Sequence, residues 1–205
     1  MLKRKVSIID YGIGNLLSVR EAFRFLGCEV NTCKEPEEVK SLDILVLSGV
    51  GNFSSAIQKI KQKNLFDAID THVKEGKPLI GICLGMQLFA TVSYENGIHK
   101  GFNWIKAKVE RLDENESRVP NIGWREIKHL DNQIFKRLRD SSFYFMHSYH
   151  LVPEENSCII ATFQFGKAQI VAAVKKDNIV GFQFHPEKSQ ADGIRVLYNT
   201  LESLK

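Results

Sequence analysis

Cys83, His185 and Glu187 are the residues of this sequence best suited to covalent chemistry. Cys83 lies in the run Gly81-Ile82-Cys83-Leu84-Gly85, and the other two flank a proline in the run Phe184-His185-Pro186-Glu187. A thiolate is a nucleophile, an imidazole can take up its proton, and a carboxylate can orient the imidazole. The residue types therefore predict a cysteine-nucleophile enzyme. Because the two runs lie far apart in the chain, the fold must bring them together.

The residues before Cys83 predict a strand that ends at the nucleophile. Residues 78–82 are short, apolar and partly β-branched, which is typical of a buried strand. If a helix begins at Leu84, Gly81 and Gly85 leave room at a sharp strand-to-helix turn, as in a nucleophile elbow. The amino end of that helix, including the N–H of Leu84, would favour a thiolate and stabilise an oxyanion.

An inert, buried thiol is the competing interpretation for any cysteine. The flanking glycines and the downstream histidine favour catalysis for Cys83 alone, and we assign Cys28, Cys33 and Cys158 a structural role. An even count of four cysteines also permits disulfides. Reduced thiols are expected here, because the sequence shows no secretion signal.

The segment before His185 also predicts a strand. Residues 178–184 alternate in a way that is typical of a strand, which would end at the histidine. Residues two apart in an extended chain point to the same side, so Glu187 can hold the imidazole while its other nitrogen faces the thiol. Pro186 helps to keep the chain extended. A single histidine is usually an ordinary polar residue, but this combination favours a catalytic one.

The chain resembles the class I glutamine amidotransferases, a family with a Cys-His-Glu triad, and most closely the glutaminase subunits of imidazole glycerol phosphate synthases. The resemblance implies that L-glutamine is hydrolysed through a thioester at Cys83, with His185 as general acid and base, Glu187 orienting it, and no cofactor. It covers nearly the whole chain, because the matching motifs occur in the expected order at residues 10–15, 49–53, 81–87, 123–124, 143–149 and 181–189.

The same resemblance implies a partner that uses the ammonia. In this family a channel leads to a (β/α)8-barrel cyclase subunit, which makes imidazole glycerol phosphate and an aminoimidazole carboxamide ribotide in histidine biosynthesis. The expected assembly is a heterodimer. Asn15, Trp124 and Tyr144 are interface candidates, with core packing as the comparable alternative for the two aromatic residues.

Further site residues follow from the resemblance. Val50 and Gly51 come after an apolar strand at residues 44–47, so their backbone N–H groups, with that of Leu84, are candidates for the oxyanion site. Glycines in this loop allow a peptide flip, although an ordinary turn explains them equally well. The positions that match those holding the amino-acid head of the substrate are Gly49, Gln87, His147, Ser148 and Tyr149. For Gln87, a solvated helix face is the competing interpretation.

Three positions depart from the family pattern. Ser48 replaces the usual proline, Asn121 a histidine and Arg125 an asparagine. They leave the triad intact but affect the oxyanion loop and the partner-facing surface. The first alternative is therefore a related glutaminase subunit that supplies ammonia to a sugar amidotransferase for surface polysaccharides. A stand-alone cysteine hydrolase is an alternative from another class, and a non-enzymatic binding protein is disfavoured by the complete triad.

The order of the expected elements predicts an α/β fold. Strands at residues 6–10, 29–33, 44–47 and 79–82 alternate with helices after Asn15, a possible cap, and at 65–75, which is typical of a mostly parallel sheet between helices. Strands dominate the second half, at 109–112, 143–149, 159–165, 169–175 and 179–184, before a last helix near 194–204. With the resemblance, this predicts a flavodoxin-like three-layer fold with antiparallel additions and a single domain over residues 1–205.

Composition excludes several other classes of protein. The chain has 205 residues, of which 43% are hydrophobic, and its net charge is +4. Most of its basic residues are interspersed with acidic ones. That supports one sizeable core and no nucleic-acid footprint. No segment approaches the roughly 20 apolar residues of a membrane span, so we expect a cytoplasmic protein. His147 and His150 lack a further metal ligand nearby, and Leu17 stands where a dinucleotide-binding fingerprint needs its third glycine.

Overall fold

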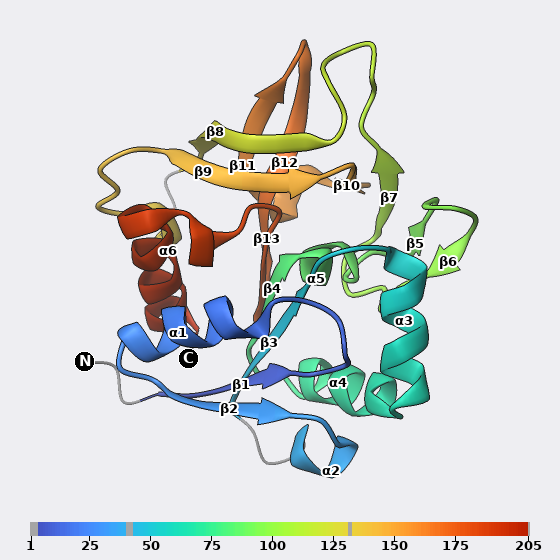
Figure 1. Ribbon diagram of the computed structural model, residues 1–205, viewed down its shortest axis with the longest axis vertical. Coiled ribbons are helices and arrows are strands. Elements are labelled where there is room, and N and C mark those ends of the chain that lie inside the picture. The colour runs from blue at the N-terminus through green and yellow to red at the C-terminus, as the bar shows by residue number, and fades with distance from the viewer. Residues whose placement is uncertain (1–3, 40–42, 131–132, 205) are drawn as a thin grey trace.

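A nine-stranded sheet in the order β2-β1-β3-β4-β13-β12-β11-β8-β9 runs through the molecule (Figure 1). The computed structural model describes residues 4–39, 43–130 and 133–204. The first five strands in this order pair in parallel, which places their carboxyl ends along one edge. They are β2 (Glu29–Cys33), β1 (Lys5–Ile9), β3 (Ile44–Gly49), β4 (Leu79–Cys83) and β13 (Ile179–Phe182).

The remaining strands extend this sheet in antiparallel fashion, as predicted. They are β12 (Ala168–Lys176), β11 (Ile159–Phe165), β8 (Asn121–His129) and β9 (Ser142–His147). A second sheet of four strands has the order β10-β7-β5-β6. Its strands are β10 (Tyr149–Pro153), β7 (Ala107–Arg111), β5 (Val92–Ser93) and β6 (His99–Lys100).

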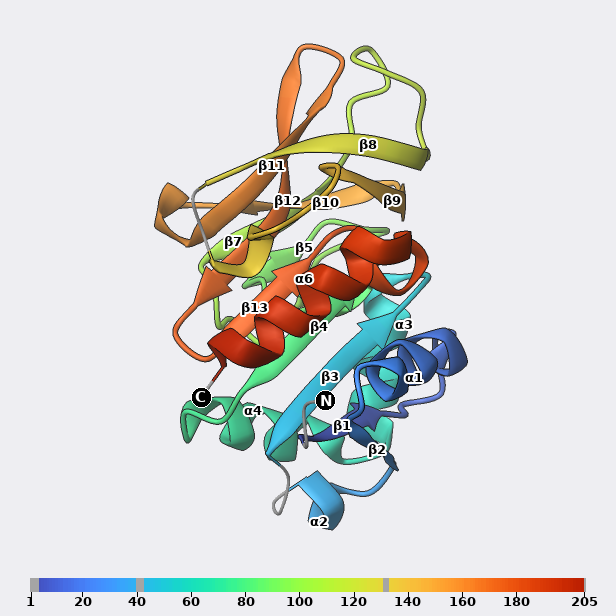
Figure 2. The same ribbon diagram turned by 90° about the vertical axis from the view of Figure 1, so that its left-hand side faces the viewer.

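Helices cover both faces of the parallel part of the sheet (Figures 1 and 2). One buried cluster joins α1 (Leu16–Phe25) and α6 (Gln190–Ser203) to one face, and another joins α3 (Phe53–Gln62) and α4 (Leu65–Lys74) to the opposite face. This confirms the predicted three-layer α/β fold. The short helices are α2 (Pro36–Val39), α5 (Leu84–Gln87), η1 (Gln133–Phe135), η2 (Asn156–Cys158) and η3 (Pro186–Lys188).

Several predicted element boundaries were wrong. The strand expected at residues 143–149 is divided at Ser148 between β9 and β10, which belong to different sheets. The last helix begins at Gln190, before the expected start near residue 194. Asn15 does precede α1, but its side-chain amide donates to the Ser18 hydroxyl at 3.1 Å and caps no backbone N–H.

The strands β5, β6 and β8 and the helix α3 were not predicted. The signal for α3 was present, because Asn52 precedes apolar residues at helical spacing and its side chain accepts from the N–H of Ser55. Within the part of the chain that the structure describes, no helix has the length and apolar character needed to cross a bilayer.

Candidate active site

Cys83 lies at a sharp turn between a buried strand and a helix. It is the last residue of β4, and α5 begins at the next residue, Leu84. Its φ of 54° and ψ of −110° lie in a region that L-amino acids rarely adopt. Such strain persists only where the surrounding structure imposes it, and it is concentrated at functional sites. The predicted elbow geometry is confirmed.

The glycines around Cys83 are required by close backbone approach. A Cβ on Gly85 would lie 1.7 Å from the carbonyl oxygen of Leu47 in β3, and a Cβ on Gly81 would lie 2.5 Å from the ring of Phe89. Neither position tolerates a side chain without movement of its neighbours. Gly85 therefore lets the turn pack against β3, and Gly81 makes room for the ring of Phe89.

We expect Gly85→Ala to lower the free energy of unfolding by at least about 3 kcal/mol, because the new methyl group meets the backbone of β3. Gly76→Ala is the matched control. Gly76 has a φ of +79° but open space around its Cβ position, so only conformational strain of about 1 kcal/mol applies. Urea unfolding of the two variants measures the difference, and equal losses would contradict the packing argument.

His185 and Glu187 form a buried ion pair. The imidazole Nδ1 lies 2.8 Å from Oε1 of Glu187, and the two side chains are only 2% and 4% exposed. The prediction that the chain is extended from His185 to Glu187 is wrong, because β13 ends at Phe182 and residues 186–188 form the 3₁₀ helix η3. Pro186 begins this turn with a fixed φ. The turn brings the carboxylate back to the imidazole.

The backbone of His185 is tied to strand β9. Its N–H donates to the carbonyl of Tyr144 at 2.8 Å. The hydroxyl of Ser189 donates to the carbonyl of His185 at 2.7 Å and accepts from the N–H of Tyr144 at 3.0 Å. Ser189 is 1% exposed and was not predicted as a site residue. These bonds fix the histidine relative to the pocket wall.

The surroundings of His185 favour its protonated form. Burial lowers the pKa of the imidazole, but its interactions with Cys83 and Glu187 outweigh burial and raise the pKa to about 10. Within the described structure, Nε2 has no hydrogen-bond partner of normal geometry. Catalytic hydrogen bonds often tighten only when substrate binds. The direction of this pKa shift favours an imidazolium near Cys83, and Nε2 is the nitrogen left to give up a proton, because Nδ1 is bonded to Glu187.

Buried amide groups connect the sulfur to the pocket. The Gln183 side chain donates to the sulfur of Cys83 at 3.8 Å, and the sulfur lies 3.8 Å from the carbonyl of Met146. Gln87 donates to Oε1 of Gln183 at 3.0 Å and to the carbonyl of Tyr149 at 2.7 Å. Gln87 is only 4% exposed, so the solvated helix face considered for it is wrong.

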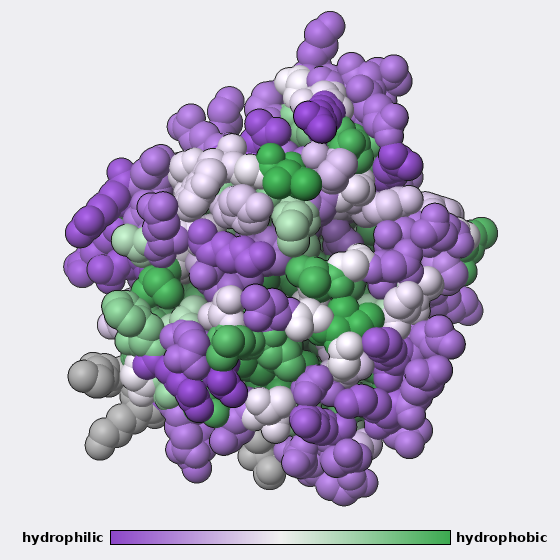
Figure 3. All heavy atoms as spheres, viewed as in Figure 1, coloured by the Kyte–Doolittle hydropathy of each residue, from purple (hydrophilic) through white to green (hydrophobic). Residues whose placement is uncertain are grey.

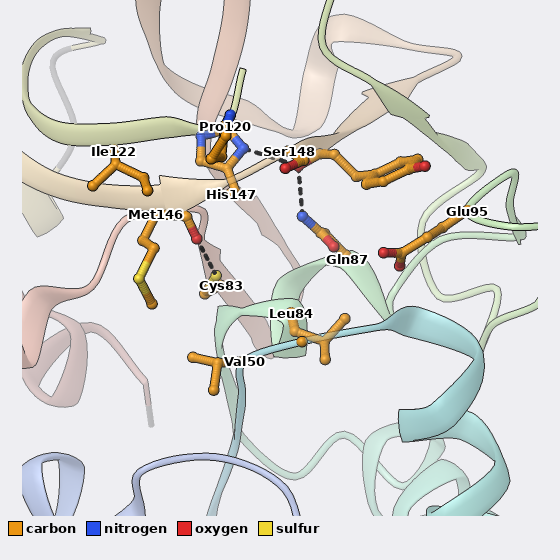
Figure 4. Close-up of a pocket in the computed structure, with 12 residues that line it drawn as sticks. Val50, Cys83, Leu84, Gln87, Glu95, Pro120, Ile122, Met146, His147 and Ser148 are labelled. Atoms are coloured by element: carbon orange, nitrogen blue, oxygen red, sulfur yellow. Dashed lines mark hydrogen bonds between the residues drawn. The ribbon is translucent and has the colours of Figure 1, made fainter. Parts of the chain in front are cut away.

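A pocket of about 250 Å³ opens beside Cys83, close to the small end of the range for ligand sites. In Figure 4, Ile122, Met146 and His147 lie on one side and Cys83, Leu84 and Val50 on the other. Most of the predicted site residues line it, and Gly49 pairs with Cys83 in the neighbouring strand. The full lining is Val50, Gly51, Cys83, Leu84, Gln87, Glu95, Pro120, Ile122, Met146, His147, Ser148 and Tyr149.

Glu95 is the acidic residue in this lining, and it was not predicted. It follows β5, and its Oε2 accepts from the N–H of Phe53 at 2.7 Å, at the first residue of α3. A carboxylate at a helix amino end is stabilised by the helix dipole. No local pattern marks Glu95 in the sequence, because the contact joins residues far apart in the chain.

The predicted interface candidates differ in exposure. Asn15 is exposed, Trp124 is 44% exposed, and Tyr144 is half-buried. The rings of Trp124 and Tyr144 meet edge to face, with centroids 6.1 Å apart.

Among the residues that the structure describes, no group of three or more His, Cys, Asp or Glu side chains is arranged to hold a metal ion.

The three-layer fold and the cysteine at the end of a central strand define a class of enzyme. The family model for class I glutamine amidotransferases matches residues 7–203. The chain belongs to this family and is a glutamine amidotransferase.

Relatives over nearly full length narrow the assignment. The chain is 39% identical to the imidazole glycerol phosphate synthase subunit HisH of Chlorobaculum tepidum, over 96% of this chain and 99% of the relative. It is 43% identical to HisH of Zymomonas mobilis, over 96% and 95% of the two chains. HisH of Aquifex aeolicus is 40% identical over 94% and 93%. Within the class, the chain is a member of the HisH family.

Solved structures of more distant proteins share the fold. A structure of PurLQS from Thermotoga maritima superimposes with a TM-score of 0.76 at 16% identity and covers 100% of both chains. A glutamine amidotransferase from the same organism gives a TM-score of 0.67 at 20% identity, over 99% of this chain and 83% of that one. At these identities the likeness concerns the fold alone.

Proposed function

We propose that this chain hydrolyses L-glutamine to glutamate and ammonia with Cys83, His185 and Glu187 as its triad. The observation that carries the proposal is a strained cysteine beside a small pocket, together with a buried histidine–glutamate pair whose imidazole pKa is raised by its proximity to Cys83 and Glu187. A carboxamide is a poor electrophile, and splitting its hydrolysis into two steps through a thioester lowers the barrier.

Each step of the reaction uses a group that is already in place. The sulfur of Cys83 attacks the carboxamide carbon, and the C=O electrons move to oxygen, where the N–H groups of Leu84 and of Val50 or Gly51 are candidate donors. The tetrahedral intermediate collapses, and His185 protonates the departing nitrogen, which leaves as ammonia. His185 then takes a proton from water as the water attacks the thioester, which releases glutamate and restores the cysteine.

The remaining pocket residues suit the amino-acid head of the substrate. The Glu95 carboxylate is placed to attract the α-ammonium group. Gln87 is held by two hydrogen bonds, and the bend at Ser148 presents backbone groups between β9 and β10. These polar groups would hold the head of glutamine while its side chain reaches Cys83.

The proposed acceptor of the ammonia is a (β/α)8-barrel cyclase subunit that makes imidazole glycerol phosphate in histidine biosynthesis. The support is the HisH family of the relatives and the apolar character of the pocket rim. Ile122 is 54% exposed where it lines the pocket, and Trp124, on the same side of β8, is 44% exposed. Apolar residues gather across the middle of this face, with hydrophilic ones around its margin (Figure 3). A partner seated there would cover the pocket mouth.

A glutamine analogue with an electrophilic diazoketone or chloroketone tests the glutaminase. We expect one equivalent to be incorporated at Cys83, identified by peptide mass spectrometry, and free glutamine to slow the labelling. Cys28, Cys33 and Cys158 serve as internal controls, because they are also buried thiols but do not line the pocket. Equal labelling of all four cysteines, or labelling that glutamine does not slow, would contradict the proposal.

The partner is tested by co-purification and by the rate of glutamine hydrolysis. The barrel cyclase of the same organism should co-purify with this chain and raise its rate of glutamate release. Recovery of a sugar amidotransferase would instead support the surface-polysaccharide alternative. Turnover of esters without a partner, and no turnover of glutamine, would support a stand-alone hydrolase.

A further inference from the structure

A directed chain of hydrogen bonds leads from Arg125 to the wall of the pocket. Nε of Arg125 donates to Oδ1 of Asn121 at 2.8 Å, and Nδ2 of Asn121 lies 2.9 Å from Nε2 of His147. Nδ1 of the same imidazole lies 2.9 Å from the carbonyl oxygen of Tyr149. Asn121 is 0% exposed and His147 is 7% exposed, so these bonds are sheltered from solvent.

The two ends of this hydrogen-bond chain, a guanidinium that only donates and a carbonyl that only accepts, together determine the direction of every bond in it. Arginine only donates, so the amide oxygen of Asn121 must face it and the NH₂ group must face the imidazole. Nε2 of His147 then accepts, and Nδ1 carries the proton that the carbonyl of Tyr149 requires. Each of the three side chains is left with one arrangement that satisfies its partners.

Both nitrogens of the His147 imidazole are occupied while the ring is neutral. Burial lowers its pKa most, the bond to Tyr149 opposes this, and the nearby His150, His185 and Arg125 add to the lowering, so that the pKa is about 3. Arg125 forms no ion pair with the described residues, and its Nε is committed to Asn121. A half-buried guanidinium without a carboxylate partner calls for a role other than a surface salt bridge.

The chain of hydrogen bonds ends at groups that shape the pocket. Asn121 and His147 are directly opposite each other on β8 and β9. The carbonyl of Tyr149 also accepts the bond from Gln87, so one oxygen joins the wall to the helix that follows Cys83 (dashed lines in Figure 4). The bend at Ser148 lies between these two anchors.

We propose that Arg125 is a positioning residue for the glutamine site, acting through Asn121 to keep the His147 imidazole neutral and held from both nitrogens, and so to fix the backbone at Ser148 and Tyr149. The kinetic part of this inference rests on the proposed glutaminase function. The part that concerns the protonation of His147 does not, because it concerns the free protein. Arg125 is expected to affect binding of the amino-acid head and to leave the chemistry at Cys83 unchanged.

The state of the imidazole is tested by ¹H–¹⁵N long-range correlation spectra of the full chain labelled at histidine, recorded over a range of pH. In the wild type, His147 should be neutral with its proton on Nδ1. In Arg125→Met the Asn121 amide is free to turn over and present its oxygen, so Nε2 can take a second proton while Nδ1 still donates to Tyr149, and the pKa of His147 should rise above about 3. Lys128→Met is the matched control, because it removes an exposed cation from the same strand and should leave the spectrum of His147 unchanged. An unchanged pKa of His147 in Arg125→Met overturns the proposal.

The kinetic test separates positioning from chemistry. In the complex with its synthase partner, Arg125→Met should raise KM for glutamine about tenfold, the scale of one lost hydrogen bond, with kcat within about twofold. Arg125→Lys should recover part of the loss, because a lysine still donates. A fall in kcat at unchanged KM overturns the proposal. Absence of glutaminase activity in the wild type would instead count against the proposed function.

Asn121→Asp provides a second variant if Arg125→Met folds poorly. A carboxylate only accepts, so Nε2 of His147 must then carry a proton while Nδ1 still donates to Tyr149. The imidazole should become cationic, and its pKa should rise well above 3 in an NMR titration. A ring that stays neutral throughout the titration overturns the inferred chain.

Discussion

Replacing His185 by glutamine should lower kcat/KM for glutamine hydrolysis by roughly 10⁴- to 10⁶-fold, the largest effect expected of any variant that retains Cys83. The imidazole would both protonate the departing ammonia and activate the water. A glutamine side chain matches its size and polarity but cannot transfer a proton at neutral pH. The rate of glutamate release in the assembled complex measures the loss.

Two comparisons make this prediction specific to the triad. His72→Gln changes another buried histidine, whose Nε2 lies 3.0 Å from the carbonyl of Pro78 and which does not line the pocket, so it should change the rate by less than about twofold. The double variant of Cys83→Ala and His185→Gln should be no slower than either single variant, because groups that act as one unit are not additive. Losses that multiply would mean that His185 acts independently of Cys83.

The parts of this site that could be predicted from the sequence depend on local geometry. The elbow at Cys83 needs glycine two residues away on both sides, and both glycines stand in the run itself. The partnership of His185 with Glu187 follows from their separation of two residues, although the turn that joins them differs from the extended chain we expected. Strands β3 and β4 were predicted because each is a short apolar run.

The parts that could not be predicted depend on contacts between distant segments. Glu95 reaches the pocket by bonding to Phe53, and Gln183 lies between Gln87 and Cys83. No pattern within a window of the sequence reports these pairs. Asn121 and Arg125 were noticed only as departures from the family, and their role became apparent when the structure joined Arg125 to Asn121 and Asn121 to His147. An apolar run predicts a strand, but it does not predict which side chains will face each other.

Glu187→Gln should lower the glutaminase rate by about 10³- to 10⁴-fold while leaving the pocket intact. The carboxylate holds Nδ1 of His185 at 2.8 Å and stabilises the imidazolium that gives its proton to the departing ammonia. A glutamine side chain has no charge and presents either its oxygen or its NH₂ group, so the ring loses both its electrostatic support and its fixed tautomer. The KM for glutamine should change little, because Glu187 does not line the pocket.

The same variant has a defined effect on stability as the pH changes. The pKa of His185 is raised to about 10 in the folded protein, above the value near 6.5 in an unfolded chain, so its ion pair stabilises the fold fully below about pH 6.5. That contribution is lost as the pH rises towards 10. Glu187→Gln removes one of the groups that raise the pKa of His185. The free energy of unfolding of the wild type should therefore exceed that of the variant by about 2 kcal/mol near pH 6. The difference should shrink steadily towards pH 10.

Urea unfolding of the two proteins at a series of pH values measures this difference, and comparison cancels the titration of groups that they share. Glu110→Gln is the control, because its exposed ion pair with Lys108 lies on β7, outside the pocket lining. The free energy of unfolding of that variant should differ from that of the wild type by less than about 1 kcal/mol at any pH. A difference for Glu187→Gln that stays constant from pH 6 to 10 would show that the carboxylate does not hold the proton of His185. In that case the imidazolium, and with it the proton given to the departing ammonia, would need another source.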